Sequence, residues 1–171
     1  VIKEYFYHYM LHNNDVTIKL GQDRQITIHE NSQVEDWEIT LVDTGENTLK
    51  GARIHKTQKY IDDDFMVTYG DGLSDINISS LVDFHKKHRK IGTVTGVSAR
   101  SPYGRIKQDD GKVRGFIEKP KIEEGIINGG FFVFQKKIFD YLNSNDECDF
   151  EIGPLEQLTR EGQLMVYHHK G

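Results

Sequence analysis

Residues 49–99 alternate between helical and extended patterns, and this alternation constrains the fold more than any other feature of the sequence. The stretch 49–61 has a helical pattern, 65–71 reads as a strand that begins with an apolar run, 76–90 is an amphipathic helix and 92–99 is β-branched. Such alternation is typical of βαβ units, in which helices cover a parallel sheet. We therefore predict an α/β fold with a Rossmann-like mixed, mostly parallel sheet and helices on both faces.

The remaining segments add antiparallel hairpins and short helices to this frame. The run Asp109-Asp110-Gly111 predicts a tight turn within a hairpin over 105–119. Asn77, Ser79 and Ser80 are candidate caps for the helix over 76–90. Trp37 is expected in the core with the phenylalanines of 131–134. Further helices are predicted over 1–12, 136–142 and 154–162, and further strands over 15–20, 25–30, 38–44, 127–135 and 163–170.

The composition is that of an ordinary globular domain. The 171 residues are 36% hydrophobic and 29% charged, and the net charge is −5 without a block of Lys and Arg. We therefore expect no nucleic-acid or membrane surface, and no apolar stretch approaches the roughly 20 residues of a membrane span. The single cysteine, Cys148, excludes an internal disulfide and fits the cytoplasm.

The two ends of the sequence suggest a domain cut from a longer protein. Val1 is not a methionine and stands within a helical pattern, and the chain stops at Gly171 just after a strand-like run. We expect residues 1–171 to form a single truncated domain.

A carboxylate between two glycines follows the apolar run at 65–69. In open α/β sheets, ligands bind beyond the carboxyl ends of strands, where Asp71 is predicted to lie. Gly70 and Gly72 permit a sharp turn, and an aspartate there suits Mg²⁺ bound together with phosphate oxygens. An ordinary turn, for which Gly and Asp are common, explains the tripeptide equally well.

Two further clusters carry candidate ligand-binding groups. Glu118 and Lys119 end a predicted strand before Pro120, so Lys119 is a candidate to bind a phosphate. The alternative is a solvated lysine at the end of a strand, which is the more common case. Asn128 has donors and acceptors suited to sugar hydroxyls, and Gly129 after it permits close approach to a sugar ring. A β-bulge at a strand entrance is the alternative interpretation of the glycine pair.

The loop before the helix over 49–61 forms a fourth candidate. It follows a predicted strand and contains Thr48, and Arg53 lies early in the helix. Both residues are candidates to contact a nucleotide. A polar loop with a surface arginine is the alternative.

Together, these four motifs resemble those of the sugar-phosphate nucleotidylyltransferases, and among them those that transfer a cytidylyl group to glucose 1-phosphate. The motifs, in order, are LVDTGENTLKGAR (41–53), YGDG (69–72), GFIEKPK (115–121) and INGGFFVF (127–134). The resemblance runs along essentially the whole chain. It implies the nucleotide-diphospho-sugar transferase fold and an enzyme that uses CTP, glucose 1-phosphate and Mg²⁺ to make CDP-glucose and pyrophosphate.

The resemblance also implies a role for each matched residue. Asp71 would bind Mg²⁺ and Lys119 would bind the sugar phosphate, and these two residues form the implied catalytic pair. Thr48, Arg53 and Gly70 would line the nucleotide pocket. Glu118, Asn128 and Gly129 would bind the sugar.

The sequence also departs from the family pattern. The glycine-rich GGxGTR loop and a second metal-binding aspartate are absent, and the usual TGGR reads Lys50-Gly51-Ala52-Arg53. We therefore expect the isolated chain to turn over poorly. A thymidylyl- or uridylyltransferase, or a non-catalytic sugar-nucleotide-binding module, remain alternatives. By family implication the product would feed surface-polysaccharide (O antigen) synthesis, and a homo-oligomer is an open expectation.

Overall fold

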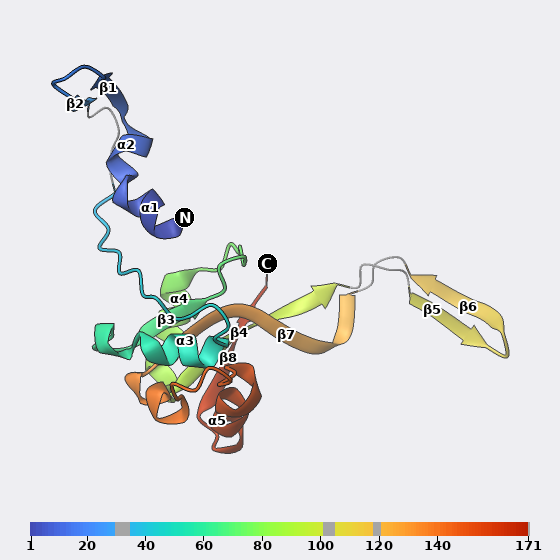
Figure 1. Cartoon of the computed structure of the whole chain (residues 1–171). Helices are drawn as coiled ribbons and strands as arrows, with labels where there is room; N and C mark the ends of the chain where they lie inside the picture. Colours follow the sequence, from blue (N-terminus) through green and yellow to red (C-terminus); the bar gives the residue numbers. More distant parts are fainter. Residues whose placement is uncertain (30–34, 101–104, 118–120, 171) are drawn as a thin grey trace. The chain divides into compact units, whose positions relative to one another are not determined.

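The computed structural model describes residues 1–29, 35–100, 105–117 and 121–170 (Figure 1). The chain forms two compact units, Val1–Asp43 and Thr44–Gly171, and each is described by itself. The expectation of a single domain over 1–171 stays a prediction.

The described residues of the first unit form two short helices and one hairpin. The helix predicted over 1–12 is interrupted at His8, whose φ of −100° and ψ of 18° leave the helical region, so it divides into α1 (Ile2–Tyr7) and α2 (Tyr9–Asn13). The strands β1 (Asp15–Lys19) and β2 (Gln25–His29) pair in antiparallel fashion.

Two sequence expectations in the first unit are wrong. The strand expected over 38–44 is absent, because no described segment pairs with those residues and an extended run needs a hydrogen-bonded neighbour to form a sheet. Trp37, expected in the core, is 63% exposed. Within this unit no described residue is buried, so a large apolar side chain has no interior to enter.

The second unit is built on a four-stranded mixed sheet in the order β3–β7–β4–β8 (Figure 1). β3 (Phe65–Thr68), β4 (Gly92–Arg100) and β8 (Leu164–His169) run in one direction, and β7 (Lys121–Phe134) runs in the opposite direction between β3 and β4. The predicted mixed α/β sheet is therefore confirmed. Among the described strands only β4 and β8 are adjacent and parallel, because β7 lies between β3 and β4 and pairs with both in antiparallel fashion.

Alternate residues of β7 enter two different hydrophobic clusters. Phe132 and Phe134 pack with Phe150 and Leu158 on one face, whereas Val133 packs with Leu81 on the other. The first cluster includes α5 (Glu156–Arg160), and the second includes α4 (Ile78–His88), which Figure 1 shows on the other side of β7. Helices on both faces were predicted, and the burial on both sides explains the apolar run of this strand.

Local sequence signals set the remaining elements. Asn77 caps α4 by accepting a hydrogen bond from the Ser80 amide at 2.9 Å. β5 (Arg105–Asp109) and β6 (Lys112–Ile117) turn at Asp110 and Gly111, both with positive φ, as the predicted hairpin requires. The other helical turns are α3 (Lys50–Lys56), η1 (Gln58–Tyr60), η2 (Lys136–Tyr141) and the kinked η3 (Glu151–Leu155).

A partly buried chain of hydrogen bonds ties α4 to the sheet. The Lys90 amide donates to His88 Nδ1 at 2.9 Å, so a neutral His88 donates from Nε2 to Thr93 Oγ1 at 2.7 Å. Thr93 in turn donates to His85 Nδ1 at 2.8 Å. Burial lowers the pKa of both histidines, which favours these neutral roles.

Candidate active site

The turn after β3 places Asp71 at the carboxyl end of that strand. The Gly72 amide donates to the Tyr69 carbonyl at 3.3 Å, which closes the turn around Gly70 and Asp71. Asp71 is exposed, and its carboxylate makes no hydrogen bond or ion pair with any residue that the structure describes. It borders a cleft of about 630 Å³, lined by Lys50, Arg53, Ile54, Val67, Thr68, Tyr69, Gly70, Asp71, Phe150 and Glu151.

Helix α3 brings two cations, Lys50 and Arg53, to this cleft. Helix α3 can pack closely against the backbone of Cys148 and Asp149 because Gly51 has no side chain. A Cβ there would lie 2.6 Å from the Asp149 carbonyl oxygen and 2.8 Å from that of Cys148. The run Lys50-Gly51-Ala52-Arg53, which replaces the family's TGGR, therefore keeps one glycine where the backbone of α3 meets that of Cys148 and Asp149.

Tyr69 and Glu151 form the polar wall of the cleft. The Tyr69 hydroxyl donates to Glu151 Oε1 at 2.5 Å, and Lys50 Nζ donates to the same oxygen at 2.6 Å. Asp149 Oδ1 holds the start of η3 in place by accepting from the amides of Glu151 and Ile152. Burial, followed by the hydrogen bond to Glu151, raises the pKa of Tyr69 to about 12, so the phenol stays protonated at neutral pH.

Asn128 joins this wall from β7. Its Nδ2 donates to the Tyr69 hydroxyl oxygen at 3.2 Å, and its Oδ1 accepts from the Gly130 amide at 2.9 Å. Thr95 of β4 lies opposite Gly129–Phe131 in an irregular stretch of the β4–β7 ladder, so the glycine pair forms the bulge considered in the sequence analysis.

Each glycine of that bulge accommodates a protein group. A Cβ on Gly130, whose φ is +78°, would lie 2.9 Å from the Tyr69 ring, and a Cβ on Gly129 would lie 2.9 Å from Val97. The space beside these glycines is therefore filled from within the fold. The predicted contact of Gly129 with the sugar stays a prediction.

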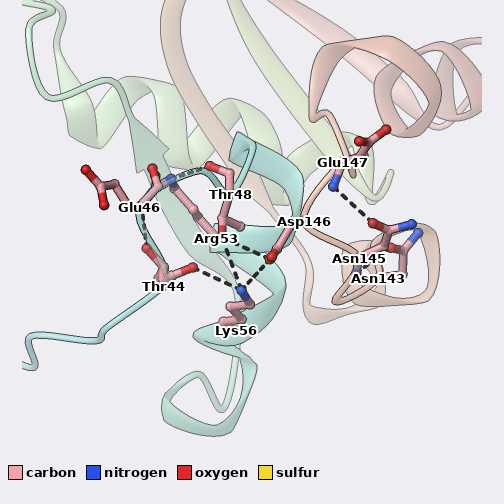
Figure 2. Close-up of polar contacts among 9 residues, drawn as sticks. All are labelled: Thr44, Glu46, Thr48, Arg53, Lys56, Asn143, Asn145, Asp146 and Glu147. Atoms are coloured by element: carbon pink, nitrogen blue, oxygen red, sulfur yellow. Dashed lines mark hydrogen bonds and ion pairs between the residues drawn. The ribbon is translucent and has the colours of Figure 1, made fainter.

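Arg53 and Lys56 anchor the loop before α3 (Figure 2). The Arg53 guanidinium donates to the Thr48 carbonyl at 2.7 Å, to Thr44 Oγ1 at 2.6 Å and to the Glu46 carbonyl at 3.0 Å. Lys56 Nζ and the Thr48 hydroxyl both donate to Asp146 Oδ1, at 2.7 and 2.9 Å. Thr48 is buried, and these contacts serve the loop itself.

The structure brings together only part of the predicted site. Gly70, Asp71 and Arg53 border one cleft, Asn128 reaches it through Tyr69, and Thr48 lies in the loop anchored by Arg53. Glu118 and Lys119 lie outside the described residues, so the expected pairing of Lys119 with Asp71 stays a prediction.

Sequence reasoning missed Lys50, Tyr69 and Glu151. Tyr69 and Lys50 stand inside quoted motifs, but their polar groups were not singled out. Glu151 had no motif around it, and its partners Lys50 and Tyr69 are 101 and 82 positions away in the sequence.

The cleft suits a divalent cation only if the substrate supplies further ligands. Among the residues that the structure describes, no three His, Cys, Asp or Glu side chains converge to hold a metal. Mg²⁺ is commonly bound by one or two carboxylates together with water and substrate phosphates, which an exposed Asp71 permits. The described helices also include none that is long and apolar enough to cross a membrane.

Comparison with known proteins identifies the family. Two curated relatives, the glucose-1-phosphate cytidylyltransferases of Salmonella typhi and Salmonella typhimurium, are each 42% identical over the whole chain, which spans 66% of their length. The crystal structure of HddC from Yersinia pseudotuberculosis complexed with GMP-PN has a TM-score of 0.52 at 26% identity, over 73% of this chain and 55% of that one. Residues 12–171 match the sequence profile of the family described as nucleotidyl transferase. This chain belongs to the nucleotidyl transferase family.

Proposed function

We propose that the protein containing this chain transfers a cytidylyl group from CTP to glucose 1-phosphate, giving CDP-glucose and pyrophosphate. The observation that carries the proposal is the 42% identity, over the whole chain, to relatives named for this reaction. The cleft beyond β3 supports it, since ligands of open α/β sheets bind at that edge.

The reaction requires two anions to meet. A phosphate oxygen of glucose 1-phosphate attacks the α-phosphorus of CTP, and pyrophosphate leaves with the electrons of the broken P–O bond. The phosphate monoester is already anionic at neutral pH, so the protein has to align the two substrates and offset their charge. Lys50 and Arg53 bring positive charge to the cleft where this alignment would occur.

The individual roles follow from the motifs. Asp71 would hold Mg²⁺, which supplies neutralisation of phosphate charge when bound. Lys119 would bind the sugar phosphate. The sugar itself would be bound by Glu118, Asn128 and Gly129. The nucleotide would be bound by Thr48, Arg53 and Gly70. The Arg53 guanidinium donates its hydrogen bonds to the loop of residues 44–48, so Arg53 would act on the nucleotide chiefly by fixing the shape of that loop.

The test is a pyrophosphate-release assay on the full-length protein with glucose 1-phosphate, Mg²⁺ and either CTP, UTP or dTTP. We expect CTP to give at least a tenfold higher kcat/KM than the other nucleotides. Preference for UTP or dTTP would instead assign a different base within the same family. Sugar-nucleotide binding by calorimetry without any turnover would indicate a non-catalytic sugar-nucleotide-binding module.

Three wider expectations belong to the same proposal. They are a cytoplasmic location, a role in deoxysugar and surface-polysaccharide synthesis, and assembly into a homo-oligomer. Poor turnover by residues 1–171 alone also stays a prediction, and the same assay on that chain beside the full-length protein tests it.

A further inference from the structure

Asn128 is held by the fold on two sides of its amide group. The Gly130 amide donates to Oδ1, so the oxygen must face the backbone of the bulge. Nδ2 then faces the Tyr69 hydroxyl, to which it donates at 3.2 Å. An exchange of the amide oxygen and nitrogen would place an NH₂ group against the Gly130 N–H, which neither group tolerates.

Tyr69 is itself fixed from several directions. Its ring meets Phe132 edge-to-face with centroids 5.9 Å apart, contacts the bulge at Gly130, and has Lys50 Nζ 5.4 Å from its centroid. Its hydroxyl proton goes to Glu151 Oε1, so the oxygen lone pairs are free to accept from Asn128. Glu151 therefore sets the direction of the hydrogen bond between Tyr69 and Asn128.

Asn128 retains binding capacity in this arrangement. An amide offers two N–H donors and two carbonyl lone pairs. Among the described residues, Tyr69 uses one donor and Gly130 one lone pair, and the side chain is exposed. The remaining donor and lone pair point in fixed directions, which suits a hydroxyl that both accepts and donates.

We propose that Tyr69 and Glu151 are positioning residues that orient the Asn128 amide for the hydroxyl groups of the sugar phosphate. This inference rests on the proposed function, which supplies the sugar phosphate as substrate. Neither Tyr69 nor Glu151 touches the sugar in this assignment. Their effect on sugar recognition passes through Asn128.

The first experiment measures steady-state kinetics of the full-length protein carrying Tyr69→Phe. We expect the KM for glucose 1-phosphate to rise about 3- to 10-fold, the scale of one hydrogen bond, with kcat and the KM for CTP changed less than about twofold. Discrimination against monodeoxyglucose 1-phosphates should fall by a similar factor, because a loosely held amide distinguishes hydroxyl positions poorly. Glu151→Gln, which retains an acceptor for Tyr69, should raise the KM for glucose 1-phosphate less than Glu151→Ala does.

A matched control is available in the same chain. Tyr141 also donates its hydroxyl to a carboxylate, Glu161 Oε2, at 2.6 Å, outside the cleft. Tyr141→Phe should leave the KM for glucose 1-phosphate and the discrimination unchanged. An equal effect of both tyrosine variants would overturn the proposal, since it would reflect a general loss of structure.

A double-mutant cycle isolates the route through Asn128. With Asn128→Ala already present, Tyr69→Phe should add almost nothing to the KM for glucose 1-phosphate. Additive effects of the two substitutions would overturn the proposal.

The orientation can also be decided without catalysis. In the unmodified protein, one side-chain amide proton of Asn128 should exchange slowly with solvent in NMR spectra, and Tyr69→Phe should speed its exchange. Identical exchange in both proteins would overturn the positioning role. If the protein does not use glucose 1-phosphate, the proposed function fails, and this NMR comparison still decides the orientation.

Discussion

Two polar networks meet the same helix, α3, and they differ in how completely their groups are satisfied. The network around Arg53 and Lys56 is closed, since each cation donates to oxygens of the 44–48 loop or of Asp146 (Figure 2). The network around Tyr69 is open. Asn128 is exposed, and the described residues use only one of its two N–H donors and one of its two carbonyl lone pairs.

The two aspartates of these regions show the same difference. Asp146 accepts from Lys56 and Thr48, whereas Asp71 is exposed beside the cleft and unpaired within the described part of the chain. Fully satisfied polar groups hold a fold together, whereas groups that retain binding capacity are available to a ligand. We infer that the closed network maintains the loop and that the open one serves the substrate.

Removal of the unpaired carboxylate should have the largest effect. We expect Asp71→Asn in the full-length protein to lower kcat by about 100-fold or more, because a metal that offsets phosphate charge supplies several kcal/mol in the transition state. The thermal midpoint should barely change, since no described contact is lost. Steady-state kinetics and calorimetry measure the two effects.

Asp140→Asn is the matched control for this prediction. Asp140 is an exposed acid in η2, outside the cleft lining. If Asp71→Asn and Asp140→Asn are equally active, the free carboxylate has no catalytic use and the contrast between the two aspartates disappears.

Removal of the Arg53 guanidinium from the closed network should mainly lower the stability of the fold. Arg53→Ala leaves the Thr48 and Glu46 carbonyls without their donors. We expect the free energy of unfolding to fall by about 2–3 kcal/mol, in line with hydrogen bonds from a charged group. Chemical denaturation measures this change.

Arg53→Lys separates charge from geometry. Lysine keeps the charge but lacks the planar fork, so it should recover less than half of the lost stability. A large rise in the KM for CTP with unchanged stability would contradict the assignment of Arg53 to the loop and favour direct nucleotide binding.

A methyl group at the bulge should disturb the open network. In Gly130→Ala the new Cβ would stand 2.9 Å from the Tyr69 ring at a φ of +78°. We expect about 1–3 kcal/mol of destabilisation from strain and overpacking, together with a higher KM for glucose 1-phosphate. Denaturation and kinetics on the same protein measure both.

Gly162→Ala distinguishes strain from the clash with Tyr69. Gly162 also has a positive φ, +64°, but no atom lies within 4 Å of the position of its added Cβ. It should lose some stability and keep its KM. A raised KM in Gly162→Ala as well would show that strain alone accounts for the effect.

The smallest expected effect is the acid sensitivity of the closed network. The hydrogen bond from Lys56, followed by that from Thr48, lowers the pKa of Asp146 below its ordinary 3.8. A lowered pKa stabilises the fold above the ordinary value, and this contribution disappears as the pH falls through the folded-state pKa. Asp146→Asn should therefore flatten the loss of stability below about pH 4.

Asp109→Asn provides the comparison for that titration. Asp109 forms an exposed ion pair with Arg114 at 3.3 Å, which contributes little to stability. Its removal should leave the acid limb of the stability curve unchanged. If Asp146→Asn also leaves the stability below about pH 4 unchanged, the hydrogen bonds to Asp146 contribute no more to stability than a surface ion pair does.

The sequence alone determined the local structure of the second unit. The three candidate caps included Asn77, which caps α4. Asp110 and Gly111 marked the β5–β6 turn, and the apolar run that begins at Phe65 marked the strand that leads to Asp71. Each signal acts between neighbours in the chain, where backbone geometry and side-chain type suffice. The strand expected over 38–44 failed because pairing requires a partner that no local pattern specifies.

Only the tertiary structure decided which groups surround the cleft. Lys50 and Tyr69 meet Glu151, and Lys56 meets Asp146, across 101, 82 and 90 positions of sequence. Such contacts depend on how α3, β3 and the segment before α5 pack, and a few ångströms decide whether a cation anchors a loop or faces a ligand. The sequence named Asp71 and Asn128. The packing showed that Asp71 is unpaired within the described part of the chain and that Asn128 is held by Tyr69 and Gly130.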